Sequence, residues 1–486
     1  MKTQDELLAI ARRYTRKILN TTCPAPEPEN IVATGHQPCW HHCGIWAKDI
    51  VTCKFAQVVG AAALHLVVDH DICDTAIILP KQDGGEFRDL EKLEIEHRQK
   101  EIPVELRGRP GGHYVRAFCE RVLDIGRDQF CGDVWSKLTL LSDKQTSGLN
   151  SVADLVTYLQ AVLSNALGLD MLYLPVSLLC QSDAFLHFAA SIVTEAERFA
   201  ECYNRAIAGH ITLWNIKESQ TIRRLATDEK TGSIELPFWL LDRNGRRRAL
   251  HVVQTPGGPV EIRADADELG SLDSTDDGAQ AGRMRKMLAR SGFNLRPKAV
   301  VLTLFVRVYL ADWFVHGVGG ARYECITNRI IEDFYGIKGL SFGIVTANVH
   351  LPAANQNGQP PASERQVKGR LRELRYSPEK FIPASVRRKQ PVQSMIMQKQ
   401  MFIETATNRE LPEEVKRAAF NSTCEINKKL MLFAHEKREQ LEQELKRLQS
   451  RLLPSRAQPY REYFFGLFPQ ETLREMVDTA VFTEKG

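Results

Sequence analysis

The chain has 486 residues, of which 43% are hydrophobic and 26% are charged, and its formal net charge is +4. This composition predicts a soluble protein with more than one core, and the near balance of 64 basic and 60 acidic residues gives no indication of a nucleic-acid or membrane partner. The sequence contains no run of about 18 apolar residues, so we expect no transmembrane helix. The first residues lack the apolar core of a signal peptide. We therefore expect a cytoplasmic protein whose eleven cysteines stay reduced.

The first 80 residues predict a βαβ unit that follows an amphipathic helix over 4–19. Short apolar runs at 31–34 and 64–68 are typical of buried strands, and a helix is expected between them over 44–59. Residues 77–79 are a candidate third strand. This order favours a parallel sheet, in which the active site lies beyond the carboxyl ends of the strands.

The middle of the chain shows mixed patterns, with one turn-rich stretch. Residues 261–278 are acidic and predict a mobile surface loop. The other expected elements are helices over 152–167 and 184–203, a strand over 171–174, and a β-hairpin formed by 236–241 and 249–253.

The last third of the chain combines a return of the α/β pattern with a long helix. The apolar run 299–304 predicts a buried strand, and the Pro-, Asn- and Gln-rich stretch 350–367 predicts a linker. Residues 412–452 contain no helix breaker after Pro412 and predict one helix of about 60 Å. Its apolar residues recur at spacings of three and four, so it needs a partner helix, either from 386–406 or from a second subunit. Residues 463–483 are apolar enough to pack on a core.

The first cluster of chemically active residues runs from Thr34 to Gly44, between the first expected strand and its helix. It holds histidines and cysteines in the order Thr-Gly-His-Gln-Pro-Cys-Trp-His-His-Cys-Gly. Backbone amides at the helix start can bind a phosphate, and imidazoles can bind its oxygens or transfer protons. Zinc binding by residues of Cys39–Cys43 and a purely structural loop are the alternatives, and we assign no residue as a metal ligand.

The second cluster, Asp69-His70-Asp71, directly follows the second expected strand. Charges at the mouth of a buried strand cost desolvation free energy unless they are paired or used, so they would bind a ligand's hydroxyls or amine, or a divalent ion. The alternative is a capping cluster for the next helix.

The third cluster is the loop His316-Gly-Val-Gly-Gly, followed by Arg322, Tyr323 and Glu324 at the start of a helix. Glycines allow the backbone to approach a ligand closely, or allow a tight turn.

Taken together, the clusters resemble the cysteine-adding enzymes of bacillithiol biosynthesis. Thr34-Gly35-His36-Gln37 is similar to that family's Thr-Gly-Gln-Gln motif, and Asp69-His70-Asp71 to its Glu-Asp-His-Asp motif. Downstream, 294–297 resembles its Asn-x-x-x-Arg-Pro segment, 319–324 its Gly-Gly-Pro-Gly-Glu-x-x-Tyr loop, and 467–471 its closing Leu-Phe-Pro segment. The five motifs occur in family order. His36 stands where the family has glutamine.

The resemblance implies an α/β fold with a Rossmann-like parallel-sheet core, inserted connecting segments and a long C-terminal helical coiled-coil arm that mediates a homodimer. The expected domains are a first core part at 1–165, connecting segments at 166–290, a second core part at 291–385, the arm at 386–456, and a C-terminal segment at 457–486 that packs back on the core.

The resemblance also implies a ligase that joins cysteine, through its carboxyl group, to the amine of a glucosaminyl-malate-type sugar with activation by ATP or another nucleotide. The alternatives are a nucleotide-binding transferase with another small-molecule substrate, and a non-catalytic dimeric coiled-coil protein that binds a ligand. The expected catalytic residues are His36, His42, His70 and Asp71. The expected substrate- and nucleotide-binding residues are Thr34, Gly35, Gln37, His41, Gly44, Asp69, His316, Gly319, Gly320 and Tyr323.

The three clusters are expected to meet in one pocket. Each follows, or ends near, an apolar run that predicts a strand, and in a parallel sheet all strand ends of one polarity face the same crevice.

Overall fold

The fold is taken from a computed structural model that describes residues 3–20, 30–83, 86–96, 101–126, 132–140, 148–214, 218, 222–254, 258–273, 279–338, 340, 342–351, 362–408, 411–451 and 460–480. It divides into two compact units. Unit 1 comprises Met1–Leu79, Glu91–Leu351 and Arg461–Gly486, and unit 2 comprises Pro80–Leu90 and Pro352–Tyr460. Among the described residues, no helix is both long enough and apolar enough to span a bilayer.

Unit 1 contains a five-stranded sheet in the order β13-β12-β1-β2-β5, and every neighbouring pair is parallel. The strands are β1 (Ile31–His36), β2 (Ala62–Val67), β5 (Leu172–Pro175), β12 (Trp313–Gly317) and β13 (Phe342–Val345). From β1 the chain adds β2 and β5 on one side and β12 and β13 on the other. The strand order therefore reverses between β1 and β12, as in doubly wound nucleotide-binding sheets.

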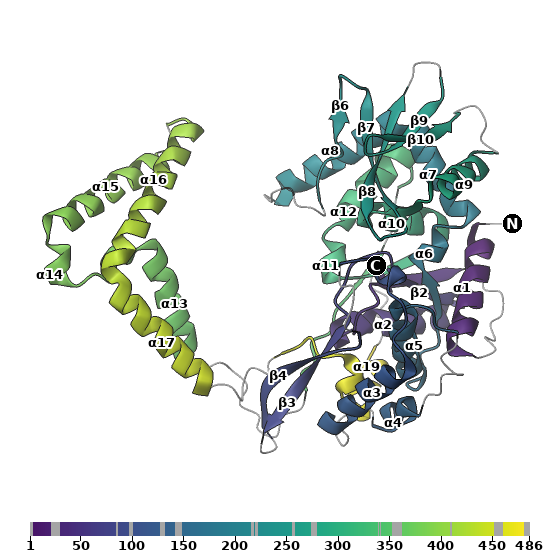
Figure 1. The fold of residues 1–486 in the computed structure, drawn as a ribbon, viewed down its shortest axis with the longest axis horizontal. Coiled ribbons are helices and arrows are strands. Elements are labelled where there is room, and N and C mark those ends of the chain that lie inside the picture. Colours follow the sequence, from purple (N-terminus) through teal and green to yellow (C-terminus); the bar gives the residue numbers. More distant parts are fainter. Residues whose placement is uncertain are drawn as a thin grey trace. The chain divides into compact units, whose positions relative to one another are not determined.

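The predicted βαβ unit is confirmed. Helix α2 (Cys43–Val59) connects β1 to β2 and packs on β1, β2 and β12. It is buried along most of its length, and it ends at Gly60, whose φ of 68° is the left-handed conformation that terminates helices. Helices α1 (Thr3–Leu19) and α5 (Val152–Asn165), also predicted, pack on each other, and α1 also packs on β5 (Figure 1).

A second, antiparallel sheet of unit 1 has the order β10-β9-β8-β7-β11, with β6 (Thr227–Asp228) paired to β7. Its hairpin of β7 (Ser233–Leu241) and β8 (Arg247–Gln254) confirms the prediction. The prediction of a surface loop over 261–278 is wrong for residues 261–272, because β9 (Val260–Ala264) and β10 (Asp267–Leu272) form an antiparallel pair there. Val260, Ile262 and Ala264 are buried in alternation with polar residues, which is a strand pattern that the acidic composition obscures. Residues 274–278 lie outside the described residues.

Two further predictions are wrong at the level of single elements, and the strand predicted at 77–79 is confirmed but lies outside the parallel sheet. The run 299–304 is a helix, α10 (Ala299–Phe305), because a short apolar run fits a buried helix as well as a strand. Residues 77–79 belong to β3 (Ala76–Asp83), which pairs with β4 (Glu86–Glu94) in a separate two-stranded sheet. The helix expected over 184–203 is two helices, α7 (Asp183–Thr194) and α8 (Ala196–Trp214), divided at Glu195.

Unit 2 consists mainly of helices that pack in pairs within the chain. Helix α15 (Gln390–Thr407) packs on α16 (Glu413–Met431), and α13 (Ala362–Tyr376) packs on α17 (His435–Arg451) (Figure 1). Helix α13 begins inside the predicted linker 350–367, of which 352–361 lie outside the described residues.

The single helix expected over 412–452 is interrupted by a 3₁₀ turn at Leu432–Ala434. Ile426, Leu430 and Ala434 are buried, whereas Phe433 is 39% exposed. The spacing of apolar residues predicts that Phe433 follows Leu430 on the buried face, whereas the tighter turn places Ala434 there. Pairing of this unit with a second chain as a coiled coil stays a prediction.

Candidate functional site

The candidate site lies at the carboxyl edge of the parallel sheet, between β1 and β12. Thr34 Oγ1 donates to Val315 O at 2.8 Å and fixes the two strands to each other near their ends. His36 is the last residue of β1, and His316 and Gly317 close β12. Because the strand order reverses here, the loops that leave the two strands diverge and leave the edge open to a ligand.

The loop from His36 to His42 is held by elements that are distant in sequence. Gln160 of α5 accepts a hydrogen bond from the His41 amide at 3.1 Å and donates to Cys39 O at 3.0 Å. From the C-terminal segment, the amide of Phe465 donates to His41 O at 2.8 Å, and the Phe465 ring stacks on Trp46 of α2. The histidine-bearing loop therefore has a fixed backbone.

Lys48 of α2 connects the ends of the two strands. Its Nζ donates to Gly35 O at 2.7 Å, and a Cβ built on Gly317 would lie 3.8 Å from its Cδ. The side chain is buried, and this burial lowers the pKa of the ammonium group to about 8. A buried cation that bonds a carbonyl at a strand end can attract an anionic ligand.

Two histidines flank the carboxylate of Asp49, the next residue of α2. His65 Nδ1 lies 2.7 Å from Asp49 Oδ1, and His41 Nδ1 lies 3.9 Å from Asp49 Oδ2. Burial raises the pKa of Asp49, but the two imidazoles outweigh burial and hold it below its usual value. Burial lowers the pKa of His36 and of His41, so both rings are neutral near pH 7.

Asp71 lies close to the end of β1. Its Oδ2 accepts from Gln37 Nε2 at 2.7 Å, and its Oδ1 accepts from Arg247 of β8 at 3.0 Å. Burial raises the pKa of Asp71, but the hydrogen bonds from Gln37 and Arg247 hold it below the usual value. The structure thus joins residues of the first and second clusters.

The other two residues of the second cluster point into the protein. Asp69 is 4% exposed, and its carboxylate accepts hydrogen bonds from the amide and hydroxyl groups of Ser177 in the short helix α6 (Val176–Leu179). His70 is buried, and its Nε2 lies 3.1 Å from Pro297 O of β11 (Asn294–Pro297). The premise that Asp69 lines the mouth of the strand is wrong, because a capping interaction takes up its carboxylate.

The third cluster is helical instead of an extended glycine loop, since Val318–Ala321 form one helical turn, α11. His316 Nε2 lies 3.0 Å from Glu324 Oε1 of α12 (Glu324–Ile330), and Arg307 donates to the other oxygen at 2.5 Å. Gly320 allows this arrangement, because a Cβ there would lie 2.7 Å from His316 Nδ1. Gly319 has open space around it, and Tyr323, the N-cap of α12, is partly buried.

His42 and Gly44 serve the start of α2. His42 is the N-cap residue and its Nδ1 accepts from the amide of Gly44 at 3.0 Å. A Cβ on Gly44 would lie 2.8 Å from Ala347 O, so glycine allows the helix to approach the segment after β13.

Three further residues of the site, Lys48, Asp49 and His65, are not among those expected from the sequence. Their signal was available: Lys48 and Asp49 are adjacent charges on the buried face of a helix, and His65 interrupts the apolar run of β2. Together with His36 and His41, Asp49 and His65 line a cavity of about 10 Å³, which is about the space of one water molecule.

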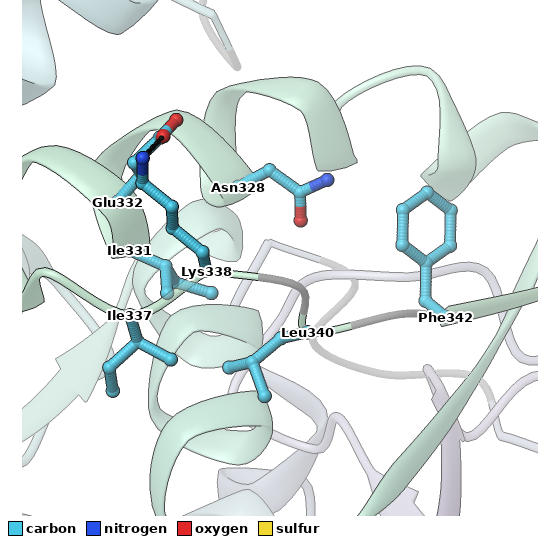
Figure 2. Close-up of a pocket in the computed structure, with 7 residues that line it drawn as sticks. All are labelled: Asn328, Ile331, Glu332, Ile337, Lys338, Leu340 and Phe342. Atoms are coloured by element: carbon cyan, nitrogen blue, oxygen red, sulfur yellow. Dashed lines mark ion pairs between the residues drawn. The ribbon is translucent and has the colours of Figure 1, made fainter.

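A larger depression, of about 460 Å³, lies at the amino end of β13 (Figure 2). Its lining residues are Asn328, Ile331, Glu332, Ile337, Lys338, Leu340 and Phe342. It contains none of the residues expected at the site, and it lies at the edge opposite to the one where doubly wound sheets bind ligands. We therefore keep the candidate site at the carboxyl edge of the sheet, where the smaller cavity also lies.

No protein-family model and no curated protein matches this chain. Among solved structures, the chain is similar to one from Campylobacter jejuni described as a "putative arginyl t-RNA synthetase", with 11% identity, a TM-score of 0.22 and 98% of each chain covered. A likeness of this size supports no inference about function.

Proposed function

We propose that unit 1 is a ligase that binds a nucleotide at the carboxyl edge between β1 and β12 and uses it to join a carboxylate to an amine. The observation that carries the proposal is the reversal of strand order at this edge, with the buried Lys48 hydrogen-bonded to Gly35 O and its stem close to Gly317. Doubly wound sheets bind nucleotides at such a position.

The chemistry requires three contributions from the chain. A carboxylate forms an amide only after activation, as an adenylate or an acyl phosphate, so the site must hold phosphate charge. Lys48 is placed to pair with a phosphate oxygen, since its ammonium group lies at the strand ends. Asp71 is the accessible carboxylate of the second cluster, with a side chain that is 37% exposed, and it would bind the amine or a sugar hydroxyl. His70 points away from this edge, so we give it no part in proton transfer.

For the substrates we propose cysteine as the carboxylate donor and a glucosaminyl-malate-type amine as the acceptor. The five motifs that occur in the order of the bacillithiol cysteine-adding family support this choice. The hydrogen bond from Gln37 to Asp71 supports the same choice of substrates, since the two residues belong to the first two motifs.

Nucleotide binding tests the site directly. Lys48→Met keeps the apolar stem and removes the charge, so we expect at least a tenfold loss of ATP affinity in calorimetric titration, as for the loss of one charge-assisted contact. Lys54→Met on the same helix is the matched control and should bind ATP as the unaltered protein does. Equal affinities of the two variants, or no ATP binding by the unaltered protein, would contradict the proposal.

The reaction itself is tested by product analysis. We expect mass spectrometry to detect the cysteine amide after incubation with ATP, cysteine and glucosaminyl-malate. Nucleotide binding with no amide product would favour the transferase with another substrate.

A further inference from the structure

We infer that His36, Cys39 and His41 form a binding site for a transition-metal ion, with Zn²⁺ as the expected occupant. One nitrogen of each imidazole and the sulfur of Cys39 lie within 4.8 Å of one another. The inference rests on this cluster and does not depend on the ligase function.

One distance within the cluster already matches a metal centre. In tetrahedral zinc sites with Zn–S bonds of about 2.3 Å and Zn–N bonds of about 2.1 Å, ligand atoms lie roughly 3.6 Å apart. Cys39 Sγ already lies 3.7 Å from His36 Nδ1. The nitrogen of His41 lies within 4.8 Å of these two atoms, so metal binding requires the His41 ring to move toward them. Two imidazoles and one thiolate are a ligand set that Zn²⁺ and Cu²⁺ accept and that Mg²⁺ and Ca²⁺ do not favour.

The orientation of His41 supports the assignment. Its Nδ1 faces Asp49 Oδ2 at 3.9 Å, and its Nε2 lies on the side of the 36–39 loop, 3.1 Å from Gln37 O. The 3.9 Å separation is longer than a hydrogen bond, so Asp49 faces this nitrogen without fixing the tautomer, and metal binding requires Nε2 to exchange the Gln37 carbonyl for the ion. Asp49 is itself held by His65 at 2.7 Å, so its carboxylate has a fixed position behind the His41 ring.

The local fold gathers the three ligands. The amide of Cys39 donates to Gln37 O at 2.8 Å, and this tight turn folds the loop so that residues three and five positions after His36 meet it. Gln160 fixes the backbone of both Cys39 and His41. The cavity of about 10 Å³ beside His36 and His41 leaves room for a water molecule as fourth ligand, as in catalytic zinc sites.

The contacts have one other explanation, which is a hydrogen-bond network without an ion. In it, Cys39 pairs with His36, and His41 donates to Gln37 O. The two explanations differ in a measurable property, because only a metal site binds Co²⁺ through sulfur.

The test is titration of the full-length, chelator-treated protein with Co²⁺, followed by absorption spectroscopy and by elemental analysis after reloading with Zn²⁺. We expect about one ion per chain and a thiolate-to-cobalt charge-transfer band. The band should vanish in Cys39→Ser and persist in Cys43→Ser, the matched control, whose sulfur lies outside the cluster.

Two further variants keep the test decisive if Cys39→Ser unfolds. His36→Gln alters a partly exposed ligand and should abolish stoichiometric Co²⁺ binding. Asp49→Asn should lower Co²⁺ affinity about 10- to 100-fold, as is typical for residues that support a metal ligand from behind. Circular dichroism establishes that each variant is folded. Absence of a sulfur-to-cobalt band in the unaltered protein, or its persistence in Cys39→Ser or His36→Gln, would overturn the inference.

Discussion

At the residue scale, unit 1 contains several buried charges whose partners explain them. Arg296 forms an ion pair with Glu105 at 2.6 Å, and Arg307 forms one with Glu324 at 2.5 Å. Buried charges remain in a fold when they are paired and hydrogen-bonded. Lys48 differs from these arginines, because the hydrogen bond it makes is to a carbonyl at the edge of the sheet, where a ligand can add the negative charge.

Asp69 predicts a specific pH dependence of stability. Burial, reinforced by Glu105, raises its pKa to about 7 against the hydrogen bonds from Ser177 and the charge of Arg296. The folded state therefore binds a proton that the unfolded state releases near pH 4, so stability should fall as the pH rises from about 4 through 7.

The measurement is the melting temperature of Asp69→Asn relative to the unaltered protein between pH 4 and 8. Asparagine removes the titrating group and keeps an oxygen for the Ser177 amide. The melting temperature of the variant should therefore rise relative to that of the unaltered protein as the pH rises. A difference that is constant with pH would disprove the raised pKa.

At the element scale, helix ends and turns follow the local sequence, whereas buried faces depend on tertiary contacts. Gly60 ends α2 with a φ of 68° and has no atoms within 4 Å of a Cβ built there. Gly209, inside α8, also has open space but has an ordinary helical conformation.

The two glycines predict opposite effects of the same change. Gly60→Ala should lower the free energy of unfolding by about 1 kcal/mol, because alanine resists the left-handed conformation. Gly209→Ala should raise it by about 0.5–1 kcal/mol, because alanine is the better helix former. Urea denaturation measures both, and a change of the same sign in both variants would contradict the backbone assignment.

Leu430 and Leu432 predict a similar contrast in unit 2. Leu430 is fully buried in α16, and Leu432, in the 3₁₀ turn, is 71% exposed. Leu430→Ala should cost about 2–5 kcal/mol of unfolding free energy, and Leu432→Ala about 0.5 kcal/mol or less. Similar losses for both variants would contradict the burial of Leu430 and the exposure of Leu432.

At the scale of the whole molecule, unit 2 presents apolar side chains that its own helices leave exposed. Met397 and Met401 of α15 and Phe420 of α16 are each at least 60% exposed. Exposed apolar side chains that gather on one unit are typical of an association surface. We keep the homodimer through this unit as a proposal.

The predicted effect concerns the mass in solution. The unaltered protein should be a dimer at micromolar concentration by light scattering, and Met401→Glu combined with Phe420→Glu should make it a monomer with an unchanged helical circular dichroism signal. Lys437→Glu, on α17, is the control and should leave the dimer intact. A monomeric unaltered protein would exclude the proposal.

The sequence by itself determined the local elements of this protein. Apolar runs and glycines predict β1, α2 and β2, and the periodicity of 386–406 and 412–452 predicts the helical character of these segments, because these features depend on side-chain spacing within one segment. It also marked His36, His41, Gln37 and Asp71 as residues of a site, since polar groups at strand ends are costly unless they are used.

The tertiary structure decided everything that depends on residues far apart in the chain. The run 299–304 became a helix, and Asp69 accepted hydrogen bonds from Ser177, more than 100 positions later in the chain. The strand order placed β12 beside β1, almost 280 residues earlier, and so brought Lys48 to the ends of both strands. Local patterns predict the pairing of strands that are close in sequence, such as β1 with β2 and β7 with β8, but not of distant strands, because that choice is made by the packing of whole elements against a shared core.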